Sequence, residues 1–262
     1  MDRDAELMRT FWDAKARENA TYYVSSYRPY DDQNLAEFWE WGDKLAEKFL
    51  GESAIPFDGA ESMLEIGCGV GRMTRYFAKR FREVHGLDVA PEMISKAKEN
   101  LGHLKNVTLH VGSGHDLALF GDRTFDFVFS YITFQHIPKT AIILKYIREA
   151  GRVLKTGGYF YFQVNNMPIG FRARLRLRSR LVSLVSVARG RRGSGEAAGA
   201  TSRQAPHQEP TSKGPSGLGH PAWRGSRMSV AQIERACRES QLKILGLNGE
   251  GTQYLWVKAV KP

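Results

Sequence analysis

The stretch Glu65-Ile66-Gly67-Cys68-Gly69-Val70-Gly71 is the most informative part of this 262-residue chain. It begins inside a short predicted strand, residues 63–66, and precedes a helical pattern over residues 72–81. Glycine permits a positive φ angle and lets a ligand approach the backbone, and a helix N-terminus offers free N–H groups. The spacing is G-x-G-x-G, and Arg72 stands where a dinucleotide fingerprint would have its third glycine. The stretch therefore predicts a strand, a tight turn and a helix that together bind a carboxylate or phosphate, with a nicotinamide dehydrogenase as the least favoured reading.

Strand and helix patterns alternate on both sides of this turn. Apolar runs predict strands at residues 63–66, 84–87, 107–111, 125–130 and 159–164, and a closing hairpin at 243–247 and 253–259. Helical spacing predicts helices at residues 6–20, 34–50, 72–81, 91–100, 138–153 and 229–240. Gly157-Gly158 is expected to end the helix at residues 138–153. We therefore expect an α/β fold with a doubly wound, mostly parallel seven-stranded sheet, helices on both faces and an antiparallel edge from the C-terminal hairpin. Ligands of such sheets bind beyond the carboxyl ends of the strands.

We interpret the chain as one domain with additions. Residues 1–55 are expected to form an N-terminal helical lid, 56–167 the ligand-binding core, and 228–262 a helix and β-hairpin that complete the sheet. Residues 168–227 are expected to be a basic, partly disordered insertion.

Composition excludes several classes of protein. With 42% hydrophobic and 25% charged residues, the chain is expected to be globular. Two cysteines, Cys68 and Cys237, are too few for a disulfide framework or a Cys₄ zinc site, and the histidine spacing predicts no metal site. The polar N-terminal residues do not resemble a signal peptide, and no apolar run is long enough to cross a bilayer, so a cytoplasmic location is expected.

The formal net charge of +10 lies entirely within residues 168–227. Residues 171–192 mix arginine with leucine and valine at helical spacing, whereas residues 190–221 are rich in Gly, Pro, Ser and Ala. The arginine-rich part has three interpretations: a mobile lid over an anionic acceptor, a helix on an anionic membrane surface, or a solvated amphipathic helix without a ligand. A fourth use, as a phosphate clamp for nucleic acid, is less favoured because the rest of the chain carries no nucleic-acid motif.

A carboxylate, Asp88, ends the second predicted strand and completes a family pattern. The chain resembles the class I S-adenosylmethionine-dependent methyltransferases of the small-molecule type, closely over residues 60–166 and in pattern over 228–260. The motif residues are Glu65 to Gly71, Asp88, Ser113 to Leu117, Phe125-Asp126 and residues 152–158. The resemblance implies S-adenosylmethionine as the cofactor.

The resemblance also implies individual roles around that cofactor. Gly67, Gly69 and Gly71 would face its methionine part, Glu65 would hold the turn and approach the amino group, and Asp88 would bind the ribose. Val89 would pack on the adenine, and either Ser113 or Asp116 would accept a hydrogen bond from the adenine amino group, because Ser113 replaces the usual aspartate. The rest of the predicted cofactor-binding set comprises Cys68, Gly114 and Ser130.

The predicted reaction is in-line transfer of a methyl group to a small-molecule acceptor, with oxygen as the expected atom. His136 follows the fourth strand, and an imidazole with an ordinary pKa near 6.5 suits proton transfer. The alternative is that His136 orders its loop. Predicted acceptor-lining residues are Tyr22, Tyr23, Tyr27, Gln135 and Trp223. A nucleic-acid methyltransferase and an inactive cofactor-binding module stay open, as does the oligomeric state.

Overall fold

The computed structural model describes residues 3–168 and 214–262. Residues Met1–Asn166 and Pro215–Pro262 form one compact unit, and Met167–Gly214 form a second. The arginine-rich segment 171–192 and most of the predicted insertion thus lie outside the described residues, whereas residues 215–227 pack within the first unit. None of the helices in the described part of the chain is long and apolar enough to cross a membrane.

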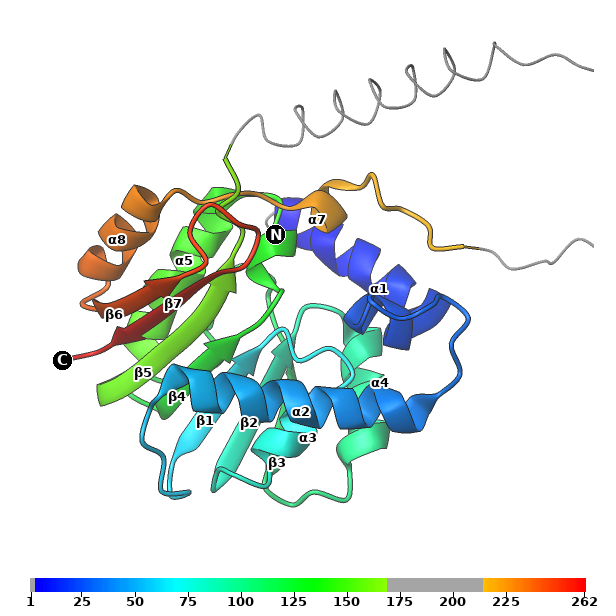
Figure 1. The fold of residues 1–262 in the computed structure, drawn as a ribbon, viewed down its shortest axis with the longest axis horizontal. Coiled ribbons are helices and arrows are strands. Elements are labelled where there is room, and N and C mark those ends of the chain that lie inside the picture. The colour runs from blue at the N-terminus through cyan, green and yellow to red at the C-terminus, as the bar shows by residue number, and fades with distance from the viewer. Residues whose placement is uncertain (1–2, 169–213) are drawn as a thin grey trace, which may run out of the picture. The chain divides into compact units, whose positions relative to one another are not determined.

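The first unit is a seven-stranded sheet in the order β3-β2-β1-β4-β5-β7-β6 (Figure 1). Neighbouring strands pair in parallel from β3 to β5, and β7 pairs antiparallel with both β5 and β6. The predicted fold class is therefore confirmed, including the antiparallel edge. The strands are β1 (Ser62–Ile66), β2 (Glu83–Asp88), β3 (Val107–Val111), β4 (Phe125–Ser130), β5 (Leu154–Val164), β6 (Lys243–Asn248) and β7 (Leu255–Val260).

The helices follow the predicted order with two short additions. They are α1 (Arg3–Val24), α2 (Leu35–Ser53), α3 (Thr74–Phe77), α4 (Pro91–Leu101), the 3₁₀ turn η1 (Phe134–His136), α5 (Thr140–Val153), α7 (Pro221–Arg224) and α8 (Val230–Glu239). The Ser229–Gln232 capping box predicted at the start of α8 is present, with both reciprocal hydrogen bonds.

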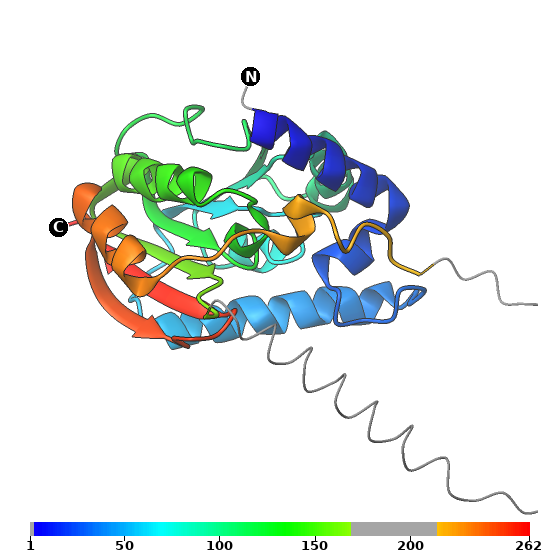
Figure 2. The same cartoon turned by 90° about the horizontal axis from the view of Figure 1, so that it is seen from above.

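Alternating strand residues build a separate core on each face of the sheet. Met63 and Phe127 pack with residues of α2 and α3, whereas Leu64 and Val128 pack with residues of α5 and α8. Figure 2 shows α2 and α5 on opposite sides of the strands. A third cluster joins α1, α2 and α4 and contains Phe38, which is fully buried. The N-terminal helices are thus integral to the core beside the first two strands.

Two predicted element boundaries are wrong. The helix predicted over residues 72–81 contains a single short α-helix, α3, because its hydrogen bonds mix i−3 and i−4 partners, as in Tyr76 N–H to Met73 O and Ala78 N–H to Thr74 O. Gly157-Gly158 lies inside β5 and does not end α5. Gly157 N–H donates to Lys261 O, and Lys261 N–H donates to Gly158 O, so pairing with the C-terminal residues extends the strand.

Candidate active site

The carboxyl ends of β1, β2 and β4 surround one large pocket. Nine of the predicted site residues line it: Glu65, Gly67, Cys68, Gly69, Asp88, Val89, Gly114, Tyr23 and His136. Eight others lie outside its lining: Gly71, Ser113, Asp116, Ser130, Tyr22, Tyr27, Gln135 and Trp223. The sequence did not assign a site role to several more lining residues, of which Arg72, Val24, Tyr131, Thr133 and Met93 contribute side chains.

The three glycines of the turn have positive φ angles but different surroundings. A Cβ on Gly67 would lie 1.9 Å from Thr133 Oγ1, and one on Gly69 would lie 2.8 Å from a methyl carbon of Val24. A Cβ on Gly71 would instead meet Leu101 at the end of α4, at 2.4 Å. Gly67 and Gly69 therefore shape the pocket floor, and Gly71 allows α4 to pack against the turn.

Asp88 connects the glycine turn to the start of α4. Its Oδ2 accepts from Gly69 N–H at 3.0 Å and its Oδ1 accepts from Ala90 N–H at 2.9 Å. Burial raises the pKa of Asp88, and these backbone hydrogen bonds counteract that rise. The carboxylate thus lies at the pocket wall, and both of its oxygens accept hydrogen bonds from backbone N–H groups.

Glu65 and Arg72 are two buried groups of opposite charge in the same pocket. Glu65 is 4% exposed and accepts from Thr74 Oγ1 at 2.6 Å. Burial raises the pKa of Glu65 to about 7, against the lowering effects of Thr74 and of the Arg72 charge. Arg72 is 5% exposed, and its Nη1 donates to Ser25 Oγ at 2.9 Å. The sequence offered no signal for Arg72 as a ligand contact, because it marked only a departure from the dinucleotide pattern.

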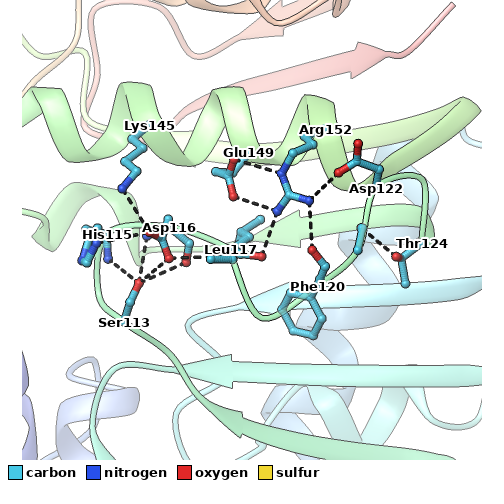
Figure 3. Close-up of polar contacts among 12 residues, drawn as sticks. Ser113, His115, Asp116, Leu117, Phe120, Asp122, Thr124, Lys145, Glu149 and Arg152 are labelled. Carbon is cyan, nitrogen blue, oxygen red and sulfur yellow. Dashed lines mark hydrogen bonds and ion pairs between the residues drawn. The ribbon is translucent and has the colours of Figure 1, made fainter.

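The loop after β3 is held by polar contacts with α5 (Figure 3). Ser113 Oγ bonds to Asp116 Oδ1 at 2.8 Å, and Asp116 Oδ2 lies 3.0 Å from Lys145 Nζ. These contacts lower the pKa of Asp116, although burial opposes them. Gly114 carries the loop to the pocket, where a Cβ would lie 2.8 Å from Val89. Of the predicted loop residues, Gly114 thus reaches the pocket, whereas Ser113 and Asp116 stabilise the loop from behind.

Aromatic side chains form part of the pocket wall. Trp12 of α1 and Tyr23 line the pocket, and the ring of Trp223 packs behind them at centroid distances of 6.0 and 5.8 Å. Tyr22 packs on Tyr23 and is not part of the lining. Residues 12 and 23 belong to α1 and residue 223 to α7, so α1 and, behind its side chains, α7 form this side of the pocket.

His136 lies in the pocket with a defined tautomer. Its Nδ1 is 2.7 Å from Trp223 O, and since a carbonyl only accepts, Nδ1 carries the proton. Nε2 is therefore the basic nitrogen, and the Gln135 side-chain amide lies 3.4 Å from it. Burial lowers the pKa of His136 to about 4, although the Trp223 carbonyl acts in the opposite direction. The imidazole is consequently neutral at pH 7.

The remaining predicted residues support neighbouring structure. Ser130 Oγ donates to Ile66 O at 3.1 Å, which ties β4 to the end of β1. The hydroxyl of Tyr27 contacts that of Tyr254, and the Tyr27 side chain is largely exposed. Gln135 accepts from Gln163 Nε2 at 3.3 Å. Within residues 3–168 and 214–262, no group of three or more His, Cys, Asp or Glu side chains could hold a metal ion.

Comparisons with known proteins agree with this geometry. Residues 64–162 match a family described as a methyltransferase domain. Phosphoethanolamine N-methyltransferase 2 of Caenorhabditis elegans is 36% identical over 131 residues, which cover 48% of this chain and 27% of that protein. A ubiquinone biosynthesis O-methyltransferase of Hydrogenovibrio crunogenus is 25% identical over 162 residues, which cover 62% of this chain and 58% of that protein. The chain spans less than two thirds of the length of either relative.

A solved structure shares the fold. Magnesium protoporphyrin IX methyltransferase from Synechocystis PCC 6803, with bound SAH, has a TM-score of 0.58 and 15% sequence identity, and the alignment covers 99% of this chain and 100% of that one. Residues 64–162 thus match a methyltransferase domain, and the seven-stranded sheet of the described chain is the fold of that solved methyltransferase.

Proposed function

We propose that this chain uses S-adenosylmethionine to methylate a small molecule, at oxygen. The observation that carries the proposal is a single pocket in which the glycine turn and Asp88 face an aromatic wall and the neutral His136. The turn and the carboxylate that would bind a nucleoside therefore line the same pocket as a basic nitrogen. The matched relatives include both an N- and an O-methyltransferase, so the acceptor atom is inferred from the site alone.

The residues present fit the cofactor. Asp88 offers carboxylate oxygens to a ribose, and Gly67 has no room for a side chain between the turn and Thr133. The buried Nε of Arg72 has no hydrogen-bond partner among the described residues, which leaves a charged donor for an anionic group. A site with these three features suits a nucleoside joined to an amino acid.

The side chains of this chain would align the reactants and accept a proton. When bound, the cofactor supplies an electrophilic methyl group on a sulfonium. Trp12 and Tyr23 exclude water and orient the acceptor, and such orientation is worth up to about 7–11 kcal/mol. His136 accepts the hydroxyl proton at Nε2. An imidazole with a pKa of about 4 is basic enough to accept this proton, because the hydroxyl becomes strongly acidic as its oxygen gains the methyl group.

The test is a transfer assay with methyl-labelled cofactor and a panel of phenols, aliphatic hydroxyls, carboxylates and primary amines. Calorimetry with S-adenosylhomocysteine on the same protein reports cofactor binding separately from transfer. Label appearing in a methyl ether supports the proposal. Binding without transfer to any member of the panel favours the inactive module, label on amines alone contradicts the oxygen assignment, and no binding refutes the proposed cofactor.

A further inference from the structure

Arg72 is a buried cation that forms no ion pair among the described residues. Its side chain lines the pocket, and its guanidinium carbon lies 5.5 Å from the centre of the Phe38 ring. Nη1 donates to Ser25, but Nε is buried and has no partner within the described part of the chain. By contrast, the neighbouring Arg75 contacts Asp43 at 2.9 and 3.2 Å near the surface. Arg72 therefore combines a side chain that lines the pocket with a buried donor that has no partner among the described residues.

The fold keeps this charge in the interior despite its cost. Removing a cation from water without a partner is strongly unfavourable, and burial accordingly lowers the pKa of Arg72. Residues from two segments nevertheless hold it: Ser25 after α1, and Phe38 and Gly42, which lie one turn apart in α2. A Cβ at position 42 would lie 2.4 Å from Arg72 Cγ, so only glycine there leaves space for the side chain. Such a built position indicates that an anion joins Arg72 in the working protein.

The charge next to Arg72 indicates the kind of anion. Glu65 lines the same pocket, and the two charges interact, since Arg72 lowers the pKa of Glu65. A carboxylate and a guanidinium in one pocket match the ammonium and carboxylate of an α-amino acid. Nε also belongs to the side edge of the guanidinium, which binds carboxylates with two hydrogen bonds.

We propose that Arg72 binds the carboxylate of the amino-acid part of the cofactor, so that Glu65 and Arg72 together recognise a zwitterion. This inference rests on the proposed function, because it assumes that S-adenosylmethionine occupies the pocket. It assigns to Arg72 a positioning role: the carboxylate anchor fixes where the methyl-bearing end of the ligand lies relative to His136.

The test compares two ligands that differ by the amino-acid part. Calorimetry measures the affinity of S-adenosylhomocysteine and of 5′-methylthioadenosine, which lacks that part, for the wild type, Arg72→Gln and the control Arg75→Gln. We expect Arg72→Gln to weaken S-adenosylhomocysteine about tenfold or more, as the loss of a charged hydrogen bond does, and to leave methylthioadenosine within about twofold. Arg75→Gln should change neither affinity.

Three results would overturn the inference. S-adenosylhomocysteine affinity that is unchanged in Arg72→Gln means that the guanidinium does not bind this ligand, and a raised KM for an acidic acceptor in the same variant would assign Arg72 to the acceptor. Equal losses for both ligands mean a structural role. If the variant does not fold, decarboxylated S-adenosylhomocysteine on the wild type decides, because equal affinity to the parent ligand excludes any carboxylate site. Failure of the wild type to bind either nucleoside refutes instead the proposed function.

Discussion

Replacing Glu65 by Gln should change how the stability of the protein depends on pH. The folded-state pKa of Glu65 is about 7, against an ordinary value of 4.5, because burial penalises the carboxylate. The folded protein therefore holds a proton that the unfolded chain releases between these two values. This contribution to the free energy of unfolding is fully present below pH 4.5 and is lost as pH rises through about 7. At 1.36 kcal/mol per pKa unit, the loss is about 3 kcal/mol.

Glutamine imitates the protonated acid at every pH, since its amide oxygen can still accept from Thr74. Urea unfolding of both proteins without ligand, at intervals from pH 4.5 to 8, gives the difference in free energy of unfolding. As pH rises across this range, we expect the wild type to lose about 3 kcal/mol of its free energy of unfolding relative to Glu65→Gln. The exposed Glu99→Gln is the matched control and should show no such trend. A difference that stays constant with pH would show that Glu65 is ionised throughout, and the reasoning from burial would fail.

Gly69→Val should abolish detectable binding of S-adenosylhomocysteine by calorimetry, because a Cβ there lies 2.8 Å from Val24 at a φ of +55°; retained affinity would show that the ligand does not approach this turn. Gly71→Ala should lower the free energy of unfolding by about 2 kcal/mol through the clash with Leu101, yet leave that affinity near normal, and a large loss of affinity would place Gly71 in the site. His136→Gln should reduce kcat about 10²- to 10⁴-fold with little change in cofactor affinity, and unchanged kcat would remove its role as base. Because the pKa of His136 is lowered to about 4, wild-type kcat should fall only as pH drops toward 4; a decline centred near 6.5 would contradict the buried, neutral imidazole.

The fold could be predicted because its signals are local. Apolar runs ending in glycine or aspartate marked β1 and β2, and the Ser229–Gln232 pair marked the start of α8. Each signal depends on residues within one turn or one strand. Of the two wrong boundaries, the one at residues 157–158 depends on a long-range contact, whereas the one at residues 72–81 reflects mixed i−3 and i−4 hydrogen bonds that no local pattern marks. Pairing with Lys261 extends β5 through two glycines that local preference assigns to a turn.

The pocket could be predicted only in part, because a motif identifies positions but not the direction of side chains. Gly69 and Asp88 were identified by their order and spacing in the sequence, and Gly69 N–H donates a hydrogen bond to the Asp88 carboxylate. Trp223 was expected to line the pocket, yet its backbone carbonyl sets the tautomer of His136 while its ring lies behind the wall. The tautomer depends on a contact between residues 87 positions apart, which no pattern in the sequence reports.

Arg72 shows how one departure from a motif can carry two meanings. Read along the chain, it makes a dinucleotide site the least favoured reading, since that fingerprint needs glycine there for close packing of a helix. In the fold, the space that close packing requires is provided from the other side, by Gly42 of α2. The turn thereby gains a buried cation beside Glu65 where a dinucleotide-binding turn has no side chain. The residue that departs from the dinucleotide pattern is thus the one to which we assign the carboxylate of the amino acid, and Gly42 in α2 leaves the space that its side chain occupies.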